Sequence, residues 1–277
     1  MKTVADPVLV GGGLGFAEGI NFDRDGTLYC VDLEGGGVWR MPRGHALQHW
    51  VHTGGRPNGS RFGPAGDLFV ADRGRKAILR LSTGAGSIAV YADRWEGRPF
   101  LGPNDLCFGP DGLLYFTDPE GSSLANPTGA VYAVAVDGSV ARVAAGLAYP
   151  NGLAVTPDGA ILIVAETATG LLRRYSLAAG GAREELEPFA ALSKLGAGPD
   201  GMAFGADGLL YVADYGLGFV HVVAPDGAVV AGMPGGGPTP TNVAFWQDSL
   251  YVTEGTSGSI YRFDIGTSEQ PPFMRPW

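Results

Sequence analysis

One stretch of the sequence decides the fold: residues 104–118, which read Asn-Asp-Leu-Cys-Phe-Gly-Pro-Asp-Gly-Leu-Leu-Tyr-Phe-Thr-Asp. The stretch begins with polar residues, passes through a short apolar segment, reaches Asp111-Gly112, and returns through a second apolar segment to the acid Asp118. Two apolar segments joined at Asp-Gly predict a β-hairpin, because both turn residues tolerate positive φ.

The same pattern recurs five more times along the chain. The copies open on oxygen-bearing side chains, here called the rim residues: Glu18, Asn58, Asn104, Asn151, Asp200 and Asn242. They close on a second set, the terminal acids: Asp32, Asp72, Asp118, Glu166, Asp214 and Glu254. Successive copies start 40 to 49 residues apart, and a third apolar segment and a weaker fourth follow in most. This period is typical of propeller blades, so residues 1–277 are predicted to form a single all-β domain, a six-bladed β-propeller with four-stranded blades.

The N-terminal segment explains how such a ring would close. Residues 8–16 resemble residues 142–149, which form the predicted outer strand and return loop before the fourth copy. We therefore expect the N-terminal strand to complete the last blade, whose inner three strands come from the C-terminal end. Closure of this kind removes exposed strand edges that invite aggregation.

Composition limits the possible partners. The chain has 46 glycines, 45% hydrophobic residues and a net charge of −9. It has no cluster of Lys and Arg, so nucleic acid is not an expected partner. It has no apolar run of about 20 residues and no signal-like N-terminus, so we expect no membrane partner and a cytoplasmic location. Cys30 and Cys107 are expected to be buried thiols. The oligomeric state stays open.

The first strand of each propeller blade lines the central channel, so the rim residues should meet at one mouth. Asn-Gly and Asp-Gly are also ordinary turn formers, but that reading explains poorly why Glu18 occupies the same place. Oxygen-only ligands favour one divalent cation, Ca²⁺ first, with Mg²⁺, Mn²⁺ or Zn²⁺ as alternatives. A zinc site built on histidines is not expected, because no histidine is a rim residue.

Other acids lie near this mouth. The terminal acids should return to the same rim, where they either cap loops or add negative potential that favours a cation. Asp105 directly follows a rim residue. It could therefore carry a proton or orient a bound water.

Several phrases resemble the gluconolactonase / senescence marker protein (regucalcin) / luciferin-regenerating enzyme family, and bacterial gluconolactonases most closely. They are residues 56–59 (Arg-Pro-Asn-Gly), 92–97, 103–106 (Pro-Asn-Asp-Leu), 115–119, 149–153 (Tyr-Pro-Asn-Gly-Leu) and 199–202 (Pro-Asp-Gly-Met). The resemblance covers nearly the whole chain. It implies a six-bladed propeller, a metal-dependent lactone hydrolase, and metal ligands at Glu18, Asn151 and Asp200. It also implies Asn104 as a direct or water-mediated ligand.

The chain departs from this family at three places. Arg73-Gly74 stands where many bacterial gluconolactonases have His-Gly, and a loop salt bridge is the alternative role for Arg73. Phe100, Leu101 and Gly102 replace polar residues in a loop expected to overhang the pocket, which would make its wall more apolar. Residues 120–123 replace a tyrosine-bearing loop.

The predicted function is hydrolysis of a lactone, either sugar-like or more apolar, or of a related ester. Asp200 is the first candidate for the residue that activates water, and Asp105 is the second. The expected contacts to the small-molecule substrate are Asn104, Arg98, Phe100 and Asn58. The alternatives are a phosphotriesterase-like hydrolase, an isomerase or lyase on the same scaffold, and a non-catalytic metal-binding propeller.

Overall fold

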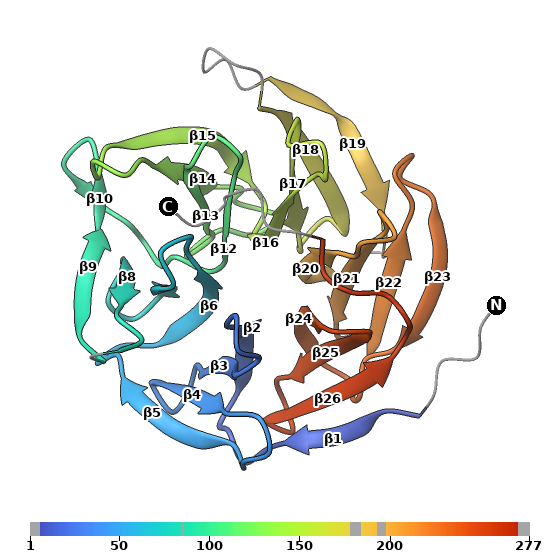
Figure 1. The fold of residues 1–277 in the computed structure, drawn as a ribbon. Helices are drawn as coiled ribbons and strands as arrows, with labels where there is room; N and C mark the ends of the chain where they lie inside the picture. The colour runs from blue at the N-terminus through green and yellow to red at the C-terminus, as the bar shows by residue number, and fades with distance from the viewer. Residues whose placement is uncertain (1–5, 85, 178–183, 193–197, 271–277) are drawn as a thin grey trace.

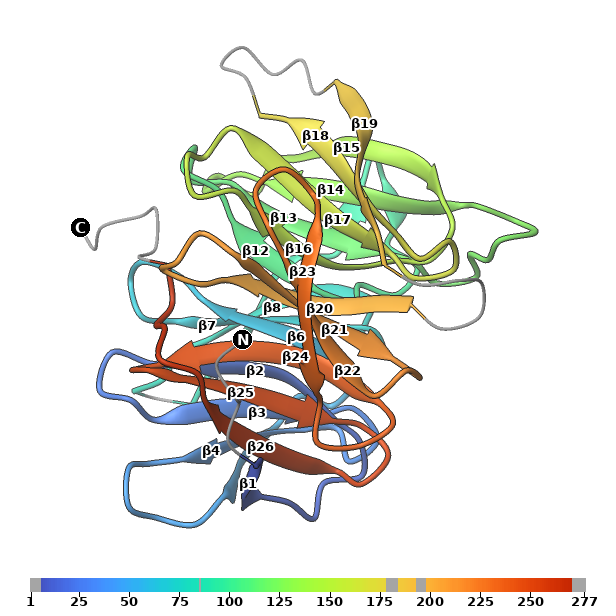
Figure 2. The same ribbon diagram turned by 90° about the vertical axis from the view of Figure 1, so that its right-hand side faces the viewer.

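The structure is a computed structural model that describes residues 6–84, 86–177, 184–192 and 198–270. Within these ranges the chain forms strands and contains no α-helix. Six four-stranded antiparallel sheets are arranged in a ring, as Figure 1 shows along the channel and Figure 2 from the side. The prediction of a six-bladed β-propeller is confirmed.

The blades follow one another in sequence order, each with its first strand innermost. The strands of the first three blades are β2 (Ala17–Phe22), β3 (Leu28–Asp32), β4 (Gly37–Met41) and β5 (Gln48–His52); β6 (Pro57–Phe62), β7 (Leu68–Asp72), β8 (Ala77–Leu81) and β9 (Ile88–Ala92); β12 (Leu106–Phe108), β13 (Leu114–Asp118), β14 (Gly129–Val134) and β15 (Val140–Leu147).

Those of the last three blades are β16 (Pro150–Val155), β17 (Ile161–Glu166), β18 (Leu171–Ser176) and β19 (Glu185–Ala191); β20 (Gly198–Phe204), β21 (Leu210–Tyr215), β22 (Phe219–Val223) and β23 (Val229–Pro234); β24 (Pro240–Trp246), β25 (Ser249–Glu254), β26 (Ser259–Asp264) and β1 (Val8–Gly11). A separate hairpin, β10 (Arg94–Trp95) and β11 (Arg98–Pro99), lies between the second and third blades in sequence.

The N-terminal strand closes the ring as predicted. β1 pairs antiparallel with β26, with Val8 opposite Arg262 and Leu9 opposite Tyr261. The two strands lie side by side at the lower edge of Figure 1. The last blade therefore joins both ends of the described chain in one sheet.

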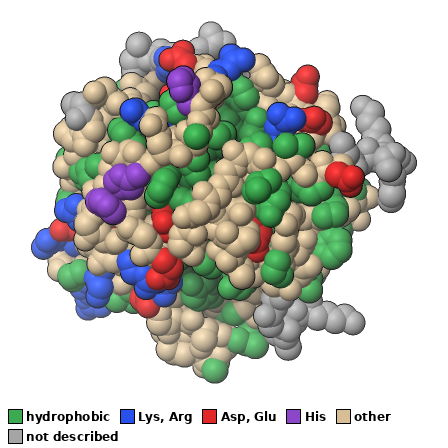
Figure 3. All heavy atoms as spheres, turned by 90° about the horizontal axis from the view of Figure 1, so that it is seen from below, with side chains coloured by type: hydrophobic (Ala, Val, Ile, Leu, Met, Phe, Trp, Pro, Cys, Tyr) green, Lys and Arg blue, Asp and Glu red, His purple; other side chains and the backbone are tan. Residues whose placement is uncertain are grey.

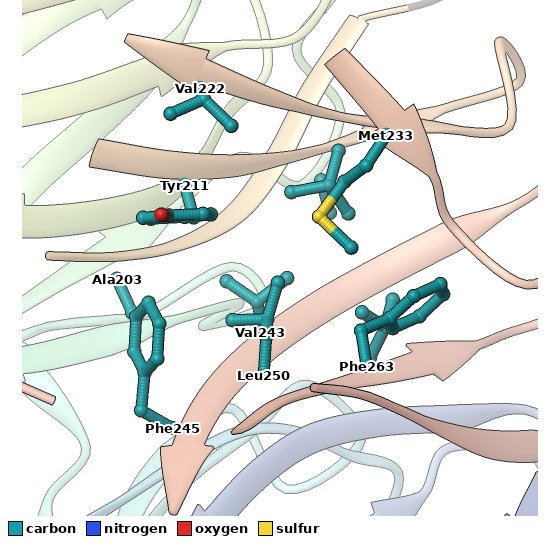
Figure 4. Close-up of a cluster of buried hydrophobic side chains, with 11 residues drawn as sticks. Ala203, Tyr211, Val222, Met233, Val243, Phe245, Leu250 and Phe263 are labelled. Atoms are coloured by element: carbon teal, nitrogen blue, oxygen red, sulfur yellow. The ribbon is translucent and has the colours of Figure 1, made fainter. Parts of the chain in front are cut away.

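The hydrophobic core lies between neighbouring blades. Figure 4 shows the cluster between the fifth and sixth blades, in which Tyr211 and Val222 of one sheet face Val243, Phe245 and Leu250 of the other. The alternation of side chains along each strand gives both faces of a blade an apolar surface, which only an adjacent blade can cover. Burial of these surfaces holds the blades at fixed angles around the channel.

The predicted hairpin turns are also confirmed. Gly26, Gly112, Gly159 and Gly208 have φ between +74° and +82°, which a residue with a Cβ rarely adopts. In three of these turns the preceding aspartate accepts a backbone N–H, as when Asp111 Oδ1 accepts the N–H of Leu113 at 3.2 Å, and in the first turn Asp23 does so instead.

Hydrogen bonds between blades fix the channel mouth. The hydroxyl of Thr117 donates to the carbonyl of Asn151 at 2.8 Å, and that of Thr167 donates to the carbonyl of Pro199 at 2.7 Å. Thr241 donates in the same way to Ala17 across the closure of the ring, at 2.8 Å. Each of these bonds ties one inner strand to the next blade, so the rim residues are held by the fold itself.

The outer surface is mixed in character. On the side seen in Figure 3, which is the lower edge of Figure 1, basic, acidic and hydrophobic side chains are interspersed. The described residues include no helix long and apolar enough to cross a membrane. Cys30 and Cys107 are buried free thiols, as expected.

Candidate metal centre

The starts of the six inner strands converge around the channel (Figure 1). All six rim residues and Asp105 are buried, with exposed fractions of 4 to 6%. Glu18, Asn58, Asn151 and Asp200 lie inside their strands, whereas Asn104 and Asp105 directly precede β12. The structure therefore brings together the predicted metal ligands and both candidate bases.

Glycine follows four of the rim residues at places where the inner strands pack closely, and Gly19 in addition has φ +51°. A Cβ on Gly152 would lie 2.1 Å from the carbonyl oxygen of Asp200 in the next blade. A Cβ on Gly59 would lie 2.3 Å from Asp105 Oδ1. Both glycines lie within strands, β16 and β6. The inner strands thus approach one another too closely for a side chain at this position.

The hydrogen-bond register makes Asp105 the counterpart of Asn242. Each backbone N–H donates to a threonine hydroxyl oxygen on the adjacent strand, that of Asp105 to Thr117 at 3.1 Å and that of Asn242 to Thr253 at 3.0 Å. Each side-chain oxygen also accepts the next backbone N–H, at 2.8 and 2.9 Å. The sequence pattern had instead aligned Asn242 with Asn104. Asp105 and Asn242 face each other across the channel, with Asn242 Nδ2 3.4 Å from Asp105 Oδ2.

Three buried carboxylates share the channel, and burial shifts their pKa values. Desolvation, with the nearby charge of Asp105, raises the pKa of Glu18 to about 8. Burial raises the pKa of Asp105 to about 6, although the positive charge of Arg61 opposes the shift. Burial and the charges of Glu18 and Asp105 raise the pKa of Asp200 well above its usual value. The described side chains therefore leave this cluster short of positive charge.

The donor set fits a hard divalent cation. Asn58 Oδ1 and Asn151 Oδ1 are buried and have no hydrogen-bond partner among the described residues. Buried amide oxygens without partners are costly unless a cation or water meets them. No three His, Cys, Asp or Glu side chains in the described ranges form a group that could hold an ion by themselves. An ion here would therefore need amide oxygens beside the carboxylates, as Ca²⁺ accepts.

Five of the six terminal acids accept N–H groups of loops, which supports the first of their two expected roles, whereas Asp214 contacts His221 at 2.7 Å. Asp32 accepts the N–H groups of Gly15 and Phe16 at 3.0 Å each. Asp118 accepts those of Leu101 and Gly102 at 2.9 and 2.7 Å. Carboxylates used in this way fix the loops that lead into the inner strands.

One residue near the site was not singled out from the sequence. Tyr149 has φ +60°, which is unusual for a residue with a side chain, and it directly precedes the strand that carries Asn151. Burial raises the pKa of its phenol, Arg73 opposes this shift, and the charges of Asp200 and Glu120 add to it. Tyr149 therefore lies among the charged groups of the mouth. Its place in the phrase Tyr-Pro-Asn-Gly was the only sequence signal.

Arg73 makes the loop salt bridge that was the alternative role for it. Its Nε lies 2.5 Å from Glu120 Oε2, and both side chains are partly exposed. This pair joins the second blade to the loop after β13.

Two predicted substrate contacts, Phe100 and Arg98, lie in surroundings that the sequence did not predict, and their role toward a substrate stays a prediction. Phe100 is 2% exposed and packs against Phe116, with ring centroids 4.8 Å apart, so the core already uses its ring. Arg98 pairs with Trp95 in the β10–β11 hairpin, and Arg142 of the outer strand β15 stacks on the Trp95 ring at 4.3 Å. The hairpin therefore lies at the periphery, because its packing partner is an outer strand.

Comparison with known proteins identifies the family of this chain. Residues 16–256 match the family described as SMP-30/Gluconolactonase/LRE-like region. The chain belongs to this family. The gluconolactonase of Zymomonas mobilis is 32% identical over 219 residues, which cover 72% of this chain and 61% of the relative. The diisopropyl-fluorophosphatase of Loligo vulgaris is 30% identical over 281 residues, covering 90% of this chain and 88% of the relative. A solved gluconolactonase from Xanthomonas campestris superposes with a TM-score of 0.82 at 25% identity, covering 93% and 89% of the two chains.

Proposed function

We propose that this protein is a divalent-metal-dependent hydrolase that opens a lactone at the channel mouth. The observation that carries the proposal is the combination of buried carboxylates, whose pKa values are raised by burial and neighbouring charge, with two buried amide oxygens that lack partners among the described residues. Such a cluster is stable in its ionised form only with a compensating cation. Family membership and the name of the Zymomonas relative favour a lactone as substrate.

Glu18, Asp200 and Asn151 are the proposed ligands, and Asn104 or Asn58 would supply a further amide oxygen. Asn58 deserves equal weight because its Oδ1 is buried without a partner in the described chain, as is that of Asn151. A bound Ca²⁺ would act as a Lewis acid that polarises the lactone carbonyl and stabilises the oxyanion.

Asp105 is our candidate for the general base, ahead of Asp200. The described residues contain no group of three His, Cys, Asp or Glu side chains that could hold an ion without amides. The proposed donor set combines Glu18 and Asp200 with amide oxygens, so Asp105 need not be a ligand. Its pKa of about 6 leaves it ionised near neutral pH, and one of its oxygens has only a 3.4 Å contact with Asn242. A carboxylate with a pKa near the working pH suits proton abstraction.

In this scheme Asp105 takes a proton from water as the water oxygen forms a bond to the carbonyl carbon. The ring C–O bond then breaks, the leaving oxygen receives the proton, and a hydroxy acid is released. Tyr149 lies where it could orient the substrate, because its phenol is near both Arg73 and Asp200.

The test is lactone hydrolysis, followed by proton release, across a Ca²⁺ titration. Asp105→Asn should keep its metal affinity and lose about 10²–10⁴-fold in turnover, the usual range for a general base. Asn151→Ala should need more Ca²⁺ and recover much of its activity at saturation. Asp248→Asn, which removes an exposed carboxylate on a turn, is the matched control. Wild-type turnover by Asp105→Asn at saturating Ca²⁺ would move the base assignment to Asp200.

A phosphotriester is the second candidate substrate class, because the Loligo relative of similar identity is a diisopropyl-fluorophosphatase. A phosphoryl oxygen suits the same Lewis acid. Parallel assays with a lactone and a phosphofluoridate would rank the two.

A further inference from the structure

A second cavity opens at the opposite mouth of the channel. Its volume is about 540 Å³, and it is lined by the far ends of the inner strands and by the hairpins that follow them. Pockets that hold small molecules measure roughly 300–1,000 Å³. None of the rim residues lines this cavity, and neither does Asp105. Its lining therefore shares no residue with the candidate metal centre, although the charge of Arg61, which lines it, also lowers the pKa of Asp105.

The wall of this cavity is mainly apolar, and the inner strands contribute one charged side chain to it. Among its lining residues are Leu153, Met202, Phe204 and Trp246. Arg61 is the one charged residue that an inner strand contributes to this wall. The Nε of Arg61 is buried and has no hydrogen-bond partner among the described residues. A buried guanidinium donor without a partner favours an anionic acceptor.

The chain itself places a carboxylate beside Arg61. After β26 the chain runs inward over the ring (Figure 1), where Gln270 N–H donates to the Phe204 carbonyl at 3.1 Å. This segment brings Glu269 Oε1 to 3.7 Å from Arg61 Nη1, and the Glu269 side chain is 49% exposed. An ion pair this long and this exposed is weak, so another carboxylate could replace it.

Two acids at the edge of this second cavity, Asp23 and Asp25, limit the negative charge that a ligand can carry. Asp23 and Asp25 lie on the hairpin between β2 and β3, and Asp25 is exposed. Asp23 Oδ1 is already committed to its own turn, where it accepts the N–H groups of Asp25 and Thr27 at 3.0 and 2.9 Å. One carboxylate at Arg61 is therefore accommodated better than two.

We propose that this cavity binds a small amphiphilic monocarboxylate, whose carboxylate replaces Glu269 at Arg61 and whose hydrocarbon chain lies against the apolar wall. The inference does not depend on the proposed lactonase function, because it uses the other mouth of the channel.

Octanoate is the probe, titrated calorimetrically into the full chain. Saturable binding at one site per chain is expected, and octanamide, which has the same shape without the charge, should bind about tenfold more weakly. Arg61→Gln should weaken octanoate binding by about tenfold or more while leaving octanamide binding unchanged. Glu269→Gln should tighten octanoate binding, because the competing carboxylate is gone.

Arg24→Gln is the matched control, since Arg24 is an exposed cation at the same mouth whose guanidinium donates to the Pro64 carbonyl. This variant should bind octanoate as the wild type does. Octanamide binding by Arg61→Gln reports that the variant is folded. If Arg61→Gln does not fold, the octanoate affinity of Glu269→Gln tests the proposal in its place. Chelation of divalent ions should leave octanoate binding intact. The absence of saturable octanoate binding, equal binding of octanoate and octanamide, unchanged affinity in Glu269→Gln, or loss of binding on chelation would each overturn the proposal.

Discussion

Removal of divalent cations should make folding stability fall as the pH rises, because the buried carboxylates Glu18, Asp105 and Asp200 all have raised pKa values in the folded protein. The contribution of Glu18 can be worked from its shift. In the folded protein, burial raises the pKa of Glu18 from 4.5 to about 8. Between these two pH values the folded chain retains the proton, whereas the unfolded chain loses it. Folding stability therefore declines with pH across this window and levels off above pH 8.

The magnitude follows from the shift. Each unit of pKa difference corresponds to about 1.4 kcal/mol, so a shift of about 3.5 units removes up to about 5 kcal/mol of stability by pH 8. Measured as a melting temperature, this loss is on the order of 10 °C for a chain of this length. Asp105 adds to the decline at the acidic end, because its pKa is raised to about 6.

Added Ca²⁺ should reverse the decline, because a cation requires the ionised carboxylates and stabilises only the folded state. At a free concentration of 100 times the dissociation constant the gain is about 2.7 kcal/mol. The gain should grow from pH 5 to pH 8. The assay is thermal unfolding of chelator-treated protein across this pH range, with and without Ca²⁺.

Two variants make the interpretation specific. Glu18→Gln cannot ionise, so its pH slope should be much flatter than that of the wild type. Glu187→Gln removes an exposed carboxylate and should keep the wild-type slope. Metal-free protein that is as stable at pH 8 as at pH 5, or a Glu18→Gln slope equal to the wild-type slope, would refute the reasoning.

Three further predictions test the architecture. Deletion of residues 1–10 removes most of β1 and should lower the melting temperature or cause aggregation, because it exposes the edge of β26; an unchanged melting curve would contradict this role. Gly152→Ala should cost roughly 2–4 kcal/mol in urea unfolding, because a Cβ would clash with a carbonyl of the next blade, whereas Gly84→Ala, which has open space, should be nearly neutral. Cys30 and Cys107 should resist a thiol reagent in the native state and react on unfolding, because burial raises the pKa of both thiols; rapid native-state modification would show that a blade opens.

The fold could be read from the sequence because its signals are local and repeated. Four of the six hairpins carry their own Asp-Gly turn, and six copies spaced 40 to 49 residues apart leave little choice of architecture. The closure by β1 was also readable, since residues 8–16 resemble an internal outer strand. Fold symmetry then placed the rim residues at one mouth, as the structure shows.

The parts that could not be read depend on register and on packing between distant residues. The irregularity between Pro240 and Asn242 in the sixth blade also occurs in other inner strands, such as between Pro150 and Leu153. Asn242 lies two residues after Pro240, whereas Asn104 lies one residue after Pro103, so Asn242 takes the place of Asp105 and not that of Asn104. For the same reason Asp105 was not recognised as the counterpart of Asn242. Phe100 was assigned to the pocket from its loop, but its burial depends on Phe116 and Tyr132, which lie far along the chain.

The three carboxylates differ in their suitability as base or metal ligand because different charges surround them. Arg61, on the same inner strand as Asn58, is close enough to lower the pKa of Asp105, and it is not among the causes that shift the pKa of Glu18 or Asp200. Asp105 can therefore be ionised near neutral pH with the protein's own charges alone. Glu18 and Asp200 need an external cation to become ionised together. A single partly buried arginine, Arg61, thus separates a residue suited to act as a base from two suited to act as ligands. Arg61→Gln should accordingly raise the apparent pKa of the activity profile, whereas Arg24→Gln should leave it unchanged; identical profiles for the two variants would contradict this separation.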